Sequence, residues 1–169
     1  HVRCANRTCY FNDVAIQFAT FLEQNGLHFM RIFRLDLCLD LTRFDYGDYP
    51  DKFLQRYING KYSKMNQVNV SAHAADSWDA RRWTSVSWGS RTSPITTRMY
   101  DKTKELREVK DKPYIRQAWC AAGLVDDMNT LCKNGEPARI WRIEFEIKTG
   151  NKKWLTIESF NTEKRKLLS

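Results

Sequence analysis

Acidic, basic and hydroxyl side chains recur at every second residue in three segments of this 169-residue chain. The first segment carries Asp36 and Asp40, and the second carries Arg98 and Tyr100. The third segment carries Arg142, Glu144 and Glu146. Carboxylates bind hard divalent cations such as Mg²⁺ or Mn²⁺, and such a cation polarises a phosphodiester. A tyrosine hydroxyl can then attack the phosphorus, while arginines hold the phosphate oxygens.

Each of these segments shows the period-two alternation of a half-buried strand. In residues 28–42, leucines point to one side and mostly charged residues point to the other. In residues 95–101 and 138–148, an apolar face likewise alternates with a polar one. If the three strands belong to one sheet, their polar side chains converge over one face. The alternative is a plain solvated sheet face, which the periodicity alone favours.

The other elements are expected to follow these strands without regular βαβ alternation. Helices are expected over residues 13–25, 51–59, the first part of 102–112, 113–123 and 126–131. Further strands are expected over residues 66–74 and 82–88. Strands in groups with helices between them predict an α+β fold. We expect a mostly antiparallel central sheet with helices packed mainly on one face.

The positive charge of the chain is concentrated in its middle third. The whole chain carries 28 Lys and Arg against 20 Asp and Glu, a net charge of +8. Residues 61–120 hold 12 basic and 6 acidic groups, which accounts for +6 of that excess. A basic patch favours nucleic acid as a partner because it releases counterions when it meets phosphates. The alternative is a domain that is basic without such a partner.

Cysteine and histidine spacing excludes several kinds of site. Five cysteines without a CxxC pair argue against a disulfide framework and against a cysteine zinc site. They suit a reducing cytoplasm, where we expect the protein. Three histidines without HxH, HExxH or HxxxH spacing give little support to zinc hydrolases or histidine-pair nickases. No run of about 18 apolar residues occurs, so we expect no membrane partner.

Four short motifs follow one another along residues 31–148. They read R-L-D-L-C-L-D (34–40), S-W-G-S-R-T-S (87–93), R-M-Y-D-K-T-K-E (98–105) and W-R-I-E-F-E (141–146). In content and order they resemble the motifs of the replication initiation factor family. That family comprises Rep-trans initiators of rolling-circle plasmids and related relaxases of conjugative elements.

The resemblance implies site-specific nicking and religation of DNA, which initiates rolling-circle replication of a plasmid or mobile element. Tyr100 would be the nucleophile that takes the 5′ phosphate and leaves a free 3′ hydroxyl. Asp36 and Glu144 would be the ligands of Mg²⁺ or Mn²⁺, with Asp40 and Glu146 as second choices. The length predicts a single nicking domain over residues 1–169, either as the whole protein or as a fragment of a longer chain.

Basic residues near the tyrosine would act with it. On the same resemblance, Arg98 and Arg142 would clamp the phosphate. Lys102 lies two residues after Tyr100, so the two would share a face if the strand continued. Lys102 would then contact the scissile phosphate or lower the pKa of the tyrosine, which is ordinarily about 10. The alternative is an ordinary exposed lysine.

Further contacts to DNA are expected from two stretches, through Gly89, Ser90, Arg91, Ser93, Arg81 and Arg82. The glycine permits a turn that other residues resist, and its serine and arginine neighbours would donate hydrogen bonds to phosphates. The paired arginines stand among tryptophans, a combination typical of surfaces that bind phosphates and the stacked bases of a melted strand. The alternative for the glycine-serine stretch is a plain hairpin loop.

The expected partner is therefore DNA at a replication or transfer origin, either single-stranded or supercoiled. A homodimer and the host helicase and polymerase are further partners that we consider. Two other hypotheses stay open. One is a non-catalytic DNA-binding module that uses the same basic sheet, and the other is an RNA-binding or structural α+β protein.

Overall fold

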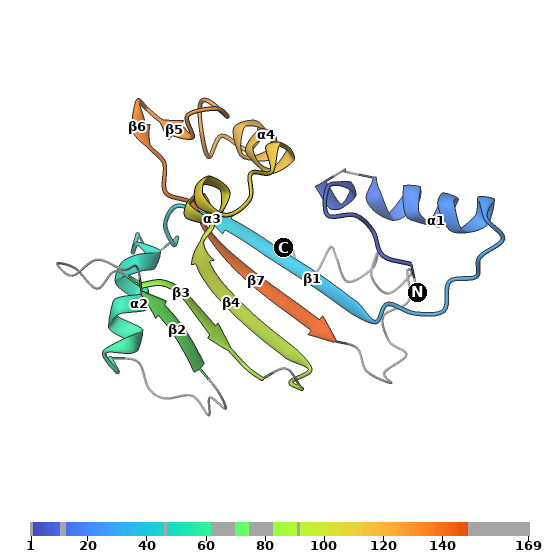
Figure 1. Cartoon of the computed structure of the whole chain (residues 1–169), viewed down its shortest axis with the longest axis horizontal. Coiled ribbons are helices and arrows are strands. Elements are labelled where there is room, and N and C mark those ends of the chain that lie inside the picture. Colours follow the sequence, from blue (N-terminus) through green and yellow to red (C-terminus); the bar gives the residue numbers. More distant parts are fainter. Residues whose placement is uncertain are drawn as a thin grey trace. The chain divides into compact units, whose positions relative to one another are not determined.

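Five strands form one sheet in the computed structural model, in the order β1-β7-β4-β3-β2 (Figure 1). The strands are β1 (Arg34–Leu41), β2 (Val70–Ala74), β3 (Trp83–Trp88), β4 (Ile95–Asp101) and β7 (Trp141–Lys148). The pairings of β2 with β3, β3 with β4 and β4 with β7 are antiparallel. The strands with the expected polar faces, β1, β7 and β4, are therefore neighbours in one sheet.

Helices and a small hairpin complete the fold. They are η1 (Thr8–Tyr10), α1 (Val14–Gln24), α2 (Pro50–Ile58), α3 (Lys102–Glu108), α4 (Pro113–Ala121), β5 (Cys132–Lys133) and β6 (Glu136–Pro137). The expected α+β class, with an antiparallel sheet and helices beside it, is confirmed.

The structure describes residues 2–10, 13–45, 47–61, 70–74, 83–90 and 92–148, with β2 described by its backbone. Their contacts divide the chain into two compact units: the first includes the described residues up to Leu35, and the second is formed by Asp36–Lys148. Within the described ranges, no helix is long and apolar enough to cross a membrane.

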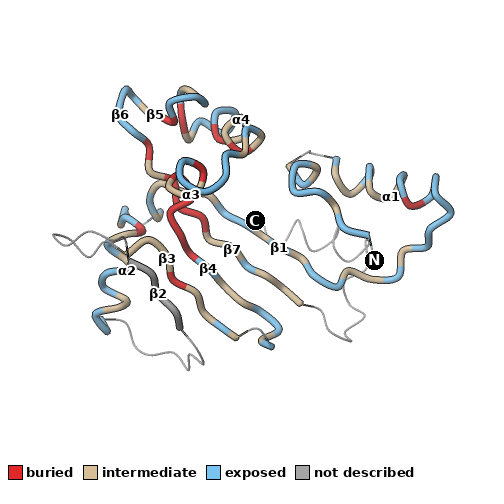
Figure 2. Tube along the Cα trace, in the orientation of Figure 1, coloured by how far each residue is buried: buried red, intermediate tan, exposed pale blue. Residues whose placement is uncertain are grey.

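The hydrophobic core of the second unit lies on one face of the sheet, where α2 packs against β3. Its central side chains are Leu54, Val86, Met99 and Trp141, and each is at most 2% exposed. Val86 and Met99 are directly opposite each other in the β3–β4 register, so they project to the same face. Buried residues continue along β4 to its end next to α3 (Figure 2).

The chain passes from β4 into α3 without a loop. The carboxylate of Asp101 accepts a hydrogen bond from the backbone N–H of Lys104 at 2.9 Å, which caps the first turn of α3. Asp101 also accepts one from Arg139 Nε at 2.8 Å. The backbone N–H of Lys102 donates to the carbonyl of Ile140 at 2.9 Å. The first residue of the helix is thereby held beside the start of β7.

Three expected elements differ from the structure. The strand expected from residue 28 begins only at Arg34, and the strand expected from residue 138 begins only at Trp141. The helix expected over residues 126–131 is wrong, because this segment forms turns that lead into the β5–β6 hairpin. The Asp127 carboxylate accepts hydrogen bonds from the backbone N–H of Asn129 and the hydroxyl of Thr130. Such local bonds compete with helix formation. Residues 66–69 and 82, expected in strands, lie outside the described residues.

We predict that Leu54→Ala lowers the free energy of unfolding by about 2–5 kcal/mol, because it leaves a cavity in a fully buried site. Urea denaturation followed by circular dichroism measures this change. Val109→Ala serves as the control, since Val109 is 78% exposed, and should change stability by no more than about 0.5 kcal/mol. Equal effects of the two substitutions would contradict the position of the core.

Candidate active site

The pairing of β4 with β7 determines which polar side chains meet. Arg98 is opposite Glu144, and Tyr100 is opposite Arg142. Directly opposite residues of antiparallel strands project to the same face, with Cβ atoms about 4.5–5.5 Å apart. Met99 and Ile143 form the pair between them and project to the core. The charged and hydroxyl side chains therefore share the face away from the α2 core.

The Tyr100 hydroxyl lies between a carboxylate and an ammonium group. It donates a hydrogen bond to Glu144 Oε2 at 3.2 Å and accepts one from Lys102 Nζ at 3.3 Å. Tyr100 is 8% exposed, so water competes little for these bonds. In this arrangement Glu144 is placed to take the hydroxyl proton, and Lys102 is placed to stabilise the oxyanion that remains.

Lys102 is a buried residue, only 1% exposed. The strand does not continue through it, because Lys102 is the first residue of α3, yet its Nζ still reaches the tyrosine hydroxyl. Glu105 Oε2 accepts a hydrogen bond from Lys102 Nζ at 2.6 Å. Lys112 Nζ donates to the other oxygen of Glu105 at 2.9 Å. The alternative of an ordinary exposed lysine is therefore wrong.

Arg98 lies over the ring of Tyr100. Its guanidinium carbon lies 4.3 Å from the centroid of the Tyr100 ring, a cation–π distance. Its Nη2 donates to Glu144 Oε2 at 3.0 Å, the same oxygen that accepts from Tyr100. The Arg98 side chain is 53% exposed, so a ligand in solvent can reach it directly.

Positive and negative groups thus alternate along one series of contacts, which we call the charge chain. Its members in order are Lys112, Glu105, Lys102, Tyr100, Glu144 and Arg98. Each charged member is bonded to an oppositely charged group or to the hydroxyl. Since desolvated charges are costly unless they are paired, this alternation is what allows a lysine to be buried here.

Burial in the charge chain shifts the pKa of several groups. It raises the pKa of Tyr100 well above its ordinary value, and the charges of Glu144 and Glu105 add to the rise. Burial lowers the pKa of Lys102 to about 8, although its hydrogen bond to Glu105 opposes that shift. Burial alone would raise the pKa of Glu105, but the bonds from Lys102 and Lys112 outweigh it and lower the pKa to about 2. At neutral pH the tyrosine is therefore uncharged and ionises only if a base takes its proton.

The same kind of competition acts on Arg98. Burial alone would lower the pKa of its guanidinium, but the adjacent Glu144 carboxylate outweighs burial and raises it. Arg98 therefore stays positively charged throughout the physiological range. A fixed, half-exposed positive charge over the tyrosine ring is suited to a phosphate oxygen.

A buried ion pair joins β1 to β7 beside the charge chain. Arg142 donates from Nε and Nη2 to the two oxygens of Asp40, each at 2.6 Å. Trp119 Nε1 of α4 donates to Asp40 Oδ2 at 2.7 Å. Arg142 is 7% exposed. The expected phosphate clamp and the expected second-choice metal ligand are thus bound to each other, and together they hold three elements in place.

The carboxylates expected to hold a metal lie on adjacent strands but have other partners. Asp40 belongs to the buried ion pair, Glu144 belongs to the charge chain, and Glu146 Oε1 lies 3.0 Å from Lys148 Nζ. Asp36 is exposed on β1. Among the residues that the structure describes, no group of three or more His, Cys, Asp or Glu is placed to hold a metal ion. Metal binding by Asp36, Glu144, Asp40 or Glu146 therefore stays a prediction.

The expected DNA-contacting loop, residues 89–94, connects β3 to β4. Gly89 has a φ of +93°, and a Cβ at that position would lie 3.0 Å from the carbonyl oxygen of Ile95. The turn therefore requires glycine. Ser93 Oγ accepts a hydrogen bond from the backbone N–H of Ser90 at 2.9 Å, which braces the loop. Contact of these serines with DNA stays a prediction, and Arg81, Arg82 and Arg91 lie outside the described residues.

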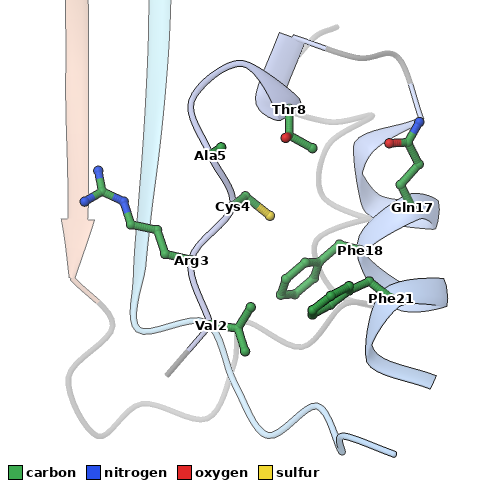
Figure 3. A pocket seen from close by; sticks show the side chains of 8 residues that line it. All are labelled: Val2, Arg3, Cys4, Ala5, Thr8, Gln17, Phe18 and Phe21. Carbon is green, nitrogen blue, oxygen red and sulfur yellow. The ribbon is translucent and has the colours of Figure 1, made fainter. Parts of the chain in front are cut away.

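A cavity of about 280 Å³ lies in the first unit, between the N-terminal segment and α1 (Figure 3). Val2, Cys4, Phe18 and Phe21 are among its lining residues. Burial raises the pKa of the Cys4 thiol, which keeps it protonated and unreactive. None of the residues expected to act on DNA lines this cavity.

Sequence analysis assigned no role to Glu105, Lys112 or Trp119. The i, i+3 spacing from Lys102 identifies Glu105 as a partner, but only once the helix is known to begin at Lys102. Lys112 and Trp119 reach the site from the loop before α4 and from α4 itself. No local pattern in the sequence signals contacts of that kind.

Comparison with known proteins gives a distant structural likeness. No protein-family model matches this chain, and no curated protein matches it. Among solved structures, the chain is similar to a rolling circle replication initiator protein from Geobacillus stearothermophilus, with a TM-score of 0.40 and 13% sequence identity. The match covers 70% of this chain and 34% of that protein. The chain therefore spans about a third of that protein's length, and a likeness at this TM-score does not decide function.

We predict that Tyr100 does not ionise together with the other tyrosines. Its pKa is raised by burial and by two neighbouring carboxylates, so its phenolate should be absent at pH values where an ordinary tyrosine, with a pKa of about 10, is ionised. Ultraviolet titration of the wild type and of Tyr100→Phe measures this. Their absorbance changes should coincide up to about pH 11. A deficit of one phenolate in the variant below that pH would contradict the burial of Tyr100.

We also predict that Arg142→Met costs about 3–5 kcal/mol of unfolding free energy, because it leaves the Asp40 carboxylate buried without its partner. The double variant Asp40→Leu/Arg142→Met should lose less, since it leaves no unpaired charge. Urea denaturation of both variants decides the matter. A double variant less stable than Arg142→Met would show that the pair itself, and not the stranded charge, is what stabilises the fold.

Proposed function

We propose that this protein nicks and rejoins DNA through Tyr100 and thereby initiates rolling-circle replication of a plasmid or mobile element. The observation that carries the proposal is the Tyr100 hydroxyl, which is hydrogen-bonded to both Glu144 and the buried Lys102. A nucleophile in contact with a base, with that base held by a third group, is the usual arrangement for covalent catalysis. Arg98 is the third group here, since it holds Glu144.

The proposed reaction is a transesterification. Tyr100 Oη attacks the phosphorus of a phosphodiester and gives its proton to the Glu144 carboxylate. The bond from phosphorus to the 3′ oxygen breaks, and that oxygen takes up the proton that Glu144 received, which gives a free 3′ hydroxyl and restores the carboxylate. The 5′ phosphate stays bonded to the tyrosine. Religation is the reverse reaction, in which a 3′ hydroxyl displaces Tyr100, and no net hydrolysis occurs.

Two cations next to the tyrosine would assist this reaction. Lys102 Nζ donates to the hydroxyl oxygen, so it would stabilise the tyrosinate that forms during attack and departure. Arg98 is exposed above the ring, so it would bind the non-bridging oxygens of the phosphate. DNA is the substrate class that the four-motif resemblance and the basic middle third of the chain support.

Use of Mg²⁺ or Mn²⁺, with Asp36 and Glu144 as ligands, is an alternative proposal that rests on the resemblance. In that arrangement Glu144 would hold the ion and would not serve as the base. Activity with either ion and its loss in EDTA would support this proposal. Equal activity in EDTA would refute metal use but leave the tyrosine chemistry intact.

The test of the proposal is covalent capture of DNA. We predict that wild-type protein, incubated with a random pool of single-stranded oligonucleotides and with supercoiled DNA, forms a protein–DNA adduct that denaturing electrophoresis resolves. Mass spectrometry should place the nucleotide on Tyr100. Tyr100→Phe should lose at least about a thousandfold in adduct formation, because its ring has no attacking oxygen.

Tyr114→Phe is the matched control, because Tyr114 is a partly buried tyrosine of α4 in the same unit. It should form the adduct at the wild-type level. Adduct formation that survives Tyr100→Phe would overturn the assignment of the nucleophile. DNA binding without any adduct or nick, with either metal present, would favour the non-catalytic DNA-binding module instead.

A further inference from the structure

We propose that Glu105 and Lys112 are positioning residues that set the charge of Lys102 beside Tyr100 by opposing effects. The proposal deepens the proposed function and rests on it, because the charge of Lys102 matters only if Tyr100 reacts. Neither residue is hydrogen-bonded to the tyrosine hydroxyl, whose partners are Glu144 and Lys102. Glu105 contacts Lys102 directly, Lys112 acts through Glu105, and the charge of Glu105 also adds to the raised pKa of Tyr100.

Glu105 and Lys112 have opposite effects on the charge of Lys102. Glu105 Oε2 lies 2.6 Å from Lys102 Nζ, so the negative charge of the carboxylate favours the ammonium form. Lys112 Nζ lies 2.9 Å from Glu105 Oε1, so its positive charge offsets part of the effect of the carboxylate on Lys102. One carboxylate is thus shared between two ammonium groups, and only one of these reaches the tyrosine.

The surroundings of Lys102 leave Glu105 as its negatively charged contact. Tyr100 of β4 presents a neutral hydroxyl, and Arg142 of β7 adds a positive charge that lowers the pKa of Lys102. Cys38 of β1, which is within electrostatic range, has its thiol pKa raised by burial and is uncharged at neutral pH. Lys102 is only 1% exposed, so burial is the main cause of its lowered pKa, followed by the opposing effects of Glu105 and of the positive charges of Arg142 and Lys112. The Glu144 carboxylate accepts from the same hydroxyl as Lys102 does and is also bonded to Arg98.

The two residues should therefore move the protonation of Lys102 in opposite directions. Removing the charge of Glu105 takes away the group that favours the ammonium, so the pKa of Lys102 falls below its value of about 8. Removing the charge of Lys112 takes away a repelling cation and leaves Glu105 entirely to Lys102, so the pKa rises. An opposite charge at this range is worth about one to three pKa units.

The experiment compares Glu105→Gln and Lys112→Met over the full pH range of adduct formation on single-stranded oligonucleotides. In the wild type, activity should decline as pH rises through about 8, because neutral Lys102 no longer stabilises the tyrosinate. Glu105→Gln should move this decline down by about one pH unit or more, and Lys112→Met should move it up. Glu108→Gln is the matched control. It lies on the same helix, with Oε2 3.6 Å from Lys104 Nζ, and should leave the profile unchanged.

A second readout does not depend on activity. NMR of protein with isotope-labelled lysine, in which the Lys102 signal is identified by its loss in Lys102→Met, titrates the amine directly. If the Lys102 pKa shifts in opposite directions in Glu105→Gln and Lys112→Met but no adduct forms, the positioning role of Glu105 and Lys112 is supported and the nicking function is refuted. If the adduct forms but the Lys102 pKa is unchanged in both variants, the positioning role of Glu105 and Lys112 is refuted and the nicking function is not. If Glu105→Gln does not fold, Lys112→Met alone tests the proposal, because the Lys112 side chain is 19% exposed and its replacement disturbs the fold less. The proposal is overturned if the pH at which activity declines is not higher in Lys112→Met than in the wild type.

Discussion

The structure of the second unit depends on the register between β4 and β7. Their pairs run from Ile95 opposite Ile147 to Asp101 opposite Trp141. A slip of one residue would turn Tyr100 toward the core and Met99 toward solvent, because side chains alternate between the two faces. A slip of two residues would keep the faces but separate Arg98 from Glu144. The buried side chains Met99 and Trp141 on one face and the Asp40–Arg142 ion pair on the other oppose both slips.

The sheet and most helices could be predicted from the sequence because their signals are local. Alternation at period two marks β1, β4 and β7, and Pro113 and Gly123 mark the ends of α4. The site was only partly predictable. Tyr100, Glu144 and Arg98 come together as the alternation suggested, but the helix start at Lys102 depends on the Asp101 cap and on the Ile140 carbonyl. The partner of Asp40 lies 102 residues away, a separation at which periodicity carries no information.

The role inferred for the acidic residues near Tyr100 changes once their partners are known. From the sequence alone they suggest a metal site, because carboxylates that face a phosphate are otherwise unfavourable. In the structure Glu105 and Glu144 each hold cations, and Asp40 holds Arg142. The acids thus keep a buried lysine charged and an exposed arginine in place. Together with burial, the charges of Glu144 and Glu105 raise the pKa of Tyr100, so its hydroxyl is neutral at physiological pH.

The direct passage of β4 into α3 also affects how the molecule folds. Residues 102–140, which form two helices and a hairpin, separate β4 from β7 in the chain, so Arg98 and Glu144 meet across 46 residues. Closing a long loop costs entropy before its contacts form, and non-local pairing slows folding. The helices α3 and α4 and the β5–β6 hairpin rest on short-range contacts and can form first. The pair that orders Tyr100 therefore depends on closure of a long loop, and a chain interrupted before residue 141 during synthesis holds the tyrosine but not the carboxylate that is bonded to it.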